Sequence, residues 1–230
     1  MFKLDSINSI HWLTFYFIII LSWLLLLFFG ASNEGIQNPS GIFESDFWAS
    51  ICRPEGDIFD FPKFVMMWIL MSLGMMLPTI IPVLRTYDDL IRGKIGNKAG
   101  FYRLILGFCV VWASFSTFTS LLQMALIRFN LIGMDGVLFN PIFSAIFLLI
   151  AAVYQLSPLK ETCLTKCRSP ITFFLEYGSE NKNYEFALGL RIGIFCLGCC
   201  WALMLLAFVG GTMNLFFMAV AMLLMTFEKL

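Results

Sequence analysis

The sequence predicts an all-α protein: a polytopic transmembrane helical bundle of about six spans, with the amino and carboxyl termini both in the cytoplasm. Of its 230 residues, 60% are hydrophobic and 13% are charged, whereas soluble domains average about 45–50% and about 25%. The apolar residues form long blocks, and residues 12–30 carry no charge. A helix needs about 20 such residues to cross a hydrocarbon core. Lipid is therefore the expected solvent for most of the chain.

The apolar segments are mainly Leu, Ile, Phe, Val and Met, and each is close to the length of a membrane-spanning helix. They cover residues 12–30, 64–84, 101–126, 140–157, 184–208 and 212–227. Neither an internal repeat nor a long linker separates them, so residues 1–230 are expected to form a single transmembrane domain. The first segment is longer than the apolar part of a signal peptide and is interpreted as a retained span.

The orientation follows from Lys and Arg, which favour the cytoplasmic side of short connections. Residues 85–103 carry five of these basic residues and residues 158–183 carry four, whereas residues 31–63 carry two. The alternation places 85–103 and 158–183 inside and the long loop 31–63 outside. This loop mixes carboxylates with aromatic residues, and we favour a solvated loop over an acidic lid that attracts cations.

Composition also excludes several functions. The formal net charge is zero and no long basic block is present, so nucleic acid is not an expected partner. The single histidine, His11, precedes the first apolar segment and is interpreted as an interfacial side chain. A catalytic arrangement needs a histidine beside its nucleophile and a histidine-rich metal site needs several, so neither is expected. No glycine-rich phosphate loop occurs. We therefore expect a protein that is not an enzyme.

Paired cysteines are the main chemical signal. Ser157 and Pro158 are typical of the start of a helix, which Pro170 would end. Cys163 and Cys167 are four residues apart on that helix, so their Cβ atoms would lie about 5–6 Å apart on one face.

The fifth apolar segment repeats this spacing with Cys196 and Cys200, and Cys199 offers an alternative. Two facing pairs would suit cuprous copper, zinc or an iron–sulfur cluster. A single shared site requires residues 158–170 to fold back; otherwise there are two sites or none. The alternative is that each cysteine packs as a small hydrophobic residue.

Methionines form a second pattern, since Met67, Met71 and Met75 recur every four residues in the second segment. Thioethers select cuprous copper, but methionine also fills gaps in packed cores. Pro78 and Pro82 predict a break in the same segment, which leaves backbone carbonyls in need of partners.

Small and polar residues in the apolar segments predict helix packing. Gly189 and Gly193 lie four residues apart and would let another helix approach closely. Arg191 lies between them and is expected to reach the membrane surface or pair with an acidic residue. Asn214 is expected to form hydrogen bonds between helices.

Several motifs resemble those of a bacterial family described as predicted metal-binding integral membrane proteins. The strongest are Tyr154-Gln155-Leu156-Ser157-Pro158-Leu159-Lys160, Cys163, Cys167-Arg168-Ser169-Pro170 and Cys196-Leu197-Gly198-Cys199-Cys200-Trp201. The similarity runs from about residue 64 to the end and includes Glu228-Lys229-Leu230. It implies a multi-pass protein of the bacterial inner membrane. Members commonly have a histidine where this chain has Ile192, which would remove one potential ligand.

Two functional hypotheses follow. In the first, Cys163, Cys167, Cys196 and either Cys199 or Cys200 bind a soft metal, with copper favoured over zinc, for metal handling or assembly of a metalloenzyme. In the second, the chain is a structural accessory subunit without a metal of its own. The expected partners are the lipid bilayer and other membrane protein subunits.

Overall fold

The computed structural model describes residues 10–33, 60–93, 98–133, 136–169, 171, 174, 184–212 and 214–229. These residues confirm the all-α class, since apart from one isolated bridge between Ile132 and Leu138 their regular structure is helical. Most of the expected outer loop, residues 31–63, lies outside the described residues, so its role stays a prediction.

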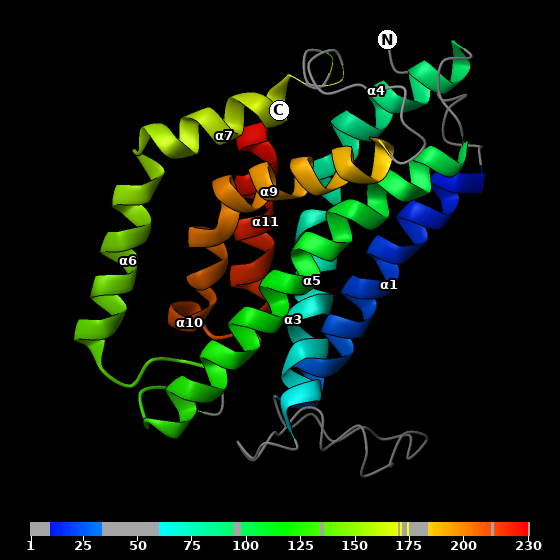
Figure 1. Ribbon diagram of the computed structural model, residues 1–230. Helices are drawn as coiled ribbons and strands as arrows, with labels where there is room; N and C mark the ends of the chain where they lie inside the picture. Colours follow the sequence, from blue (N-terminus) through cyan, green and yellow to red (C-terminus); the bar gives the residue numbers. More distant parts are fainter. Residues whose placement is uncertain are drawn as a thin grey trace, which may run out of the picture.

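The helices are α1 (Ile10–Asn33), α3 (Phe61–Met76), the 3₁₀ helix η3 (Pro78–Ile80), α4 (Ile81–Arg92), α5 (Lys98–Arg128), α6 (Pro141–Gln155), α7 (Pro158–Arg168), α9 (Tyr184–Leu205), α10 (Ala207–Gly210) and α11 (Leu215–Lys229). Figure 1 shows that the start of α1 and the end of α11 lie at the same end of the bundle. Because α7 crosses the bundle there, we call it the α7 end.

Four helical stretches are long and apolar enough to cross a membrane: His11–Phe28, Phe61–Arg92, Lys98–Arg128 and Tyr184–Gly210. Helices α6 and α7 pass the same test only together, and the chain bends by 59° between them. The sixth expected span is α11, whose 15 residues measure only about 22 Å along the helix axis. A hydrocarbon core is about 30 Å thick. The described residues thus hold four or five candidate spans, and six crossings stay a prediction.

The chain breaks at Pro78, as expected for the second apolar segment. Helix α3 ends at Met76, and η3 begins at Pro78, which has no N–H to continue the helical ladder. The Thr79 hydroxyl donates to the Met76 carbonyl oxygen at 2.8 Å and so gives that carbonyl a partner. The buried Thr79 hydroxyl also lies 3.0 Å from Lys229 Nζ of α11 and 3.7 Å from Cys196 Sγ of α9.

Helices α5 and α9 touch through their backbones. A Cβ atom added to Gly189 would overlap the Leu104 carbonyl, and one added to Gly107 would overlap the Phe186 carbonyl. A Cβ on Gly193 would lie 2.9 Å from the Val111 Cβ. We call Gly189 and Gly193 the glycine stripe. In the described part of the chain, the helix that packs against this stripe is α5.

Polar side chains tie α3 to α5. The Trp68 Nε1–H donates to Gln123 Oε1 at 2.7 Å, and the Ser72 and Ser116 hydroxyls lie 3.0 Å apart. Such bonds join helices where water is excluded.

Asn214 and Arg191, which the sequence suggested as packing residues, have other positions in the structure. The Asn214 side chain accepts from Phe217 N–H, so it caps α11, whose first N–H groups lack helical partners. Arg191 is exposed. Glu185, an acidic residue on the same helix, lies 3.7 Å from Arg103 of α5.

The predicted topology gives a direct test by reporter fusion. Fusions at Ser40 and Asn97 should report opposite sides of the membrane, because the basic residues hold 85–103 inside and leave 31–63 outside. Alkaline phosphatase and fluorescent-protein activities measured at each position distinguish the sides. The same side for both positions would contradict the six-span prediction.

Candidate metal site

Helix α7 begins and ends where the sequence predicts. The Ser157 hydroxyl caps it by accepting from Lys160 N–H at 3.2 Å, and Pro158 is its first residue. The last residue is Arg168, followed by Ser169. After a bend of 59° that follows α6, the helix packs against α9, the segment that carries the other cysteines. Whether residues 158–170 fold back into the membrane stays a prediction.

Gly198 lets α7 approach α9 closely. A Cβ atom at this position would lie 2.7 Å from the Cys163 Sγ. The Tyr154 hydroxyl, just before α7, donates to the Gly198 carbonyl oxygen, and its ring packs edge-on against Trp201. The absence of a side chain at Gly198 therefore brings Cys163 against the α9 backbone.

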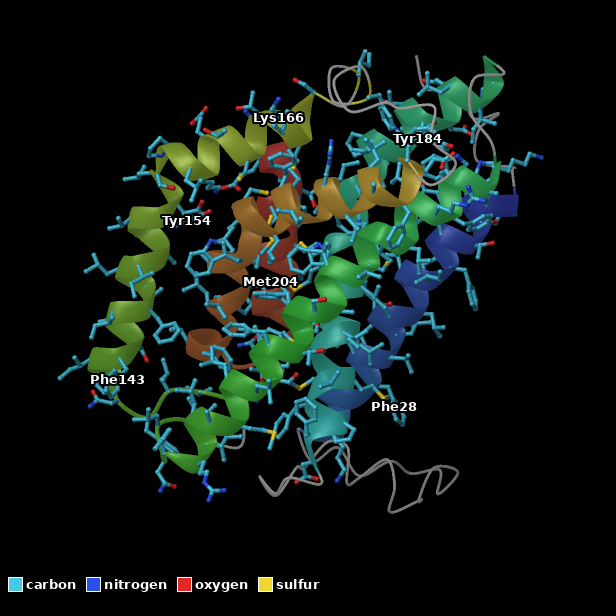
Figure 2. All side chains as sticks on the ribbon, in the orientation of Figure 1. Phe28, Phe143, Tyr154, Lys166, Tyr184 and Met204 are labelled. Carbon is cyan, nitrogen blue, oxygen red and sulfur yellow. The ribbon has the colours of Figure 1, made fainter. Side chains whose placement is uncertain are left out.

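The α9 cysteines form a buried group. Cys196, Cys199 and Cys200 are all buried, and the Sγ atoms of Cys199 and Cys200 lie 3.3 Å apart. Cys167, from α7, is partly buried against the core that contains these three cysteines. We call Cys167, Cys196, Cys199 and Cys200 the thiol cluster. Figure 2 shows yellow sulfur atoms where α7, α9 and α11 meet.

Lys229 completes this region, and sequence reasoning did not assign it to the site. Its Nζ donates to Cys196 Sγ and to Thr79 Oγ1, both at 3.0 Å. The residue is only 6% exposed. A lysine at the end of an apolar segment is ordinarily expected to extend toward water. The only sequence signal was its place in the Glu228-Lys229-Leu230 motif of the family resemblance.

A second lysine holds α7 onto the end of α11. The buried Lys160 Nζ lies 2.7 Å from both carboxylate oxygens of Glu228 and also donates to Gln155 Oε1. From the last turn of α7, Arg168 Nε donates to the Glu228 carbonyl oxygen at 2.7 Å. We call these contacts the Glu228 clamp. They hold α7, which carries Cys163 and Cys167, close to the α9 cysteines.

The four-thiolate cage considered from the sequence is not preformed. Among the described residues, no group of three or more His, Cys, Asp or Glu side chains is arranged to hold a metal ion. The thiols have protein partners instead: Cys199 Sγ donates to the Cys196 carbonyl oxygen at 3.1 Å, and Cys196 accepts from Lys229. The structure thus brings both cysteine pairs to one place without making them converge on one point.

The methionine pattern lies in the core. Met71 and Met75 are buried in the hydrophobic cluster, and Met67 is partly buried against it. This placement is that of packing side chains.

Comparison with known proteins adds one finding. A family model described as "PpoB2: Copper chaperone" matches residues 65–230. This range extends from α3 to the end of the chain and includes the thiol cluster and the Glu228 clamp. No curated protein and no solved structure matches the chain.

Proposed function

Since the chain belongs to the copper chaperone family PpoB2, we propose that it is an integral membrane protein that holds cuprous copper as cargo on paired thiols and passes it to another protein. Cys163 and Cys167 of α7 and the α9 cysteines supply the ligands. Copper is thus carried without any chemical reaction on a substrate.

The observation that carries this proposal is the packing of α7 against α9. It brings the cysteine thiols of two segments that are distant in the sequence close together. Cuprous copper selects thiolates among protein ligands. Zinc is also bound by four thiolates in a tetrahedron, but the family to which the chain belongs is one of copper chaperones. The family match therefore favours copper over zinc.

The difference in burial between the two helices supports an order of events. Cys163 and Cys167 are half-buried at the α7 end, whereas Cys196, Cys199 and Cys200 are buried. An arriving ion meets the α7 thiols first, and the α9 thiols then hold it. Each thiol releases its proton as it binds copper. Transfer is an exchange of thiolate ligands in which copper remains cuprous.

Elemental analysis of protein purified gently from its native membrane tests the proposal. Under reducing conditions, with copper and zinc both offered, we expect stoichiometric copper and little zinc. Mass spectrometry of the same preparation identifies co-purifying chains. Protein that contains no copper but retains a constant set of membrane partners would contradict the proposal and support an accessory subunit.

A further inference from the structure

Lys229 brings a positive charge into direct contact with the thiol cluster. It donates to Cys196 Sγ and Thr79 Oγ1, both at 3.0 Å, and Cys196 lies in the same buried group as Cys199 and Cys200. Lys229 is also the last residue of α11. Free carbonyls at a helix carboxyl terminus stabilise a cation, so the helix itself favours the ammonium form.

The neighbouring carboxylate does not cancel this charge. Glu228 is bound through both oxygens by Lys160 at 2.7 Å, and its backbone carbonyl accepts from Arg168. The ammonium of Lys229 instead contacts Cys196 Sγ, one of the sulfur atoms that would bind an incoming metal ion.

We infer that Lys229 is a specificity-determining residue, whose fixed positive charge makes the thiol cluster prefer monovalent cuprous copper to divalent metal ions such as zinc. The inference rests on the proposed function, since it concerns the selectivity of the same site. An ammonium repels a divalent ion twice as strongly as a monovalent ion at the same distance. The effect is larger in a buried site, where water does not screen the charges.

Charge balance leads to the same preference. Two thiolates and one ammonium carry a net charge of −1, so cuprous copper makes the site neutral whereas zinc leaves a charge of +1. A net charge that is buried away from water is costly, so with two ionised thiols the charge balance favours copper. Without Lys229 the balance at two thiolates reverses, because two thiolates and zinc are then neutral. The sign of the expected change does not depend on how many thiols ionise, since the repulsion by Lys229 always doubles with the charge of the metal.

The experiment measures the ratio of the affinities of the full chain for Cu(I) and Zn(II) in lipid nanodiscs. A cuprous chelator and a zinc-chelating dye serve as competitors. In Lys229→Met we expect this ratio to fall by at least about 10-fold, equivalent to about 1.4 kcal/mol. The ratio is the readout because the ammonium also affects how readily the thiols ionise, and this effect is common to both metals.

Three further variants make the result specific. Lys229→Arg keeps the charge and should keep the wild-type ratio. Lys229→Gln is a second neutral variant that keeps a hydrogen-bond donor on its side chain, in case Lys229→Met does not fold. Lys63→Met is the control. Lys63 lies in the first turn of α3 and pairs with Asp60, the residue just before that helix, so its loss should leave the affinity ratio unchanged.

An unchanged ratio in a folded neutral variant overturns the inference, even if copper binds and the proposed function stands. The same holds if Lys229→Arg loses selectivity as strongly as Lys229→Gln. Wild-type protein that binds no copper overturns both the inference and the proposed function.

Discussion

Leucine in place of Gly189 is expected to destabilise the protein strongly. The Cβ atom alone would overlap the Leu104 carbonyl of α5, and no rotamer can move a Cβ away from its own backbone. Helices α5 and α9 would have to separate along their length. Overpacking typically costs about 1–3 kcal/mol when side chains can adjust. Here the obstacle is backbone, so we expect about 3 kcal/mol or more, a large part of the about 5–15 kcal/mol that stabilises a domain.

The measurement is the yield of monodisperse protein after detergent extraction, together with its thermal unfolding midpoint. Gly74→Ala is the matched control, because its Cβ would meet the Leu26 side chain at an acceptable 3.4 Å. Gly193→Leu should give an intermediate effect, since its Cβ faces the Val111 side chain at 2.9 Å. A wild-type unfolding midpoint for Gly189→Leu would show that the backbone contact is not required.

The second large effect is expected for the α7 cysteines. Cys163→Ser and Cys167→Ser should each abolish stoichiometric copper while the bundle stays inserted. Each thiolate supplies both charge and coordination, and serine replaces it with a poor ligand of almost the same shape. Since loss of a group that only supports a metal ligand costs about 10–100-fold in affinity, loss of a ligand should cost at least about 100-fold.

Cys109→Ser is the control for this series. Cys109 is half-buried on α5 and has no other cysteine at ligand spacing in the sequence. Cu(I) affinity is measured by chelator competition, and secondary structure by circular dichroism. If Cys109→Ser lowers the affinity for Cu(I) as much as Cys167→Ser does, copper binding does not depend on the α7 thiols in particular and the proposed site is wrong.

Much of this architecture could be predicted from local sequence. The start of α7 at Ser157 and Pro158 and the break at Pro78 follow from the backbone chemistry of those residues. The cysteine spacing predicted which thiols share a helix face. The glycine stripe predicted a close helix contact, although not that α5 would be the partner.

The contacts that assemble the site could not be predicted in this way. Lys229 meets Thr79 across 150 residues of sequence and Cys196 across 33. No helical periodicity specifies such a meeting, because it depends on how three separate helices cross. The bend of 59° between α6 and α7 likewise decides whether the cysteine pairs meet, and a Ser-Pro dipeptide does not encode its angle.

The Glu228 clamp also affects how the protein should be produced. The last turn of α11 supplies Glu228 to α7 and Lys229 to the thiols, so a fusion placed directly after residue 230 begins close to the metal ligands. A polyhistidine tag there would add imidazoles, which themselves bind copper, and could produce a spurious stoichiometry. An affinity tag at the amino terminus, removed by protease before metal analysis, avoids this artefact.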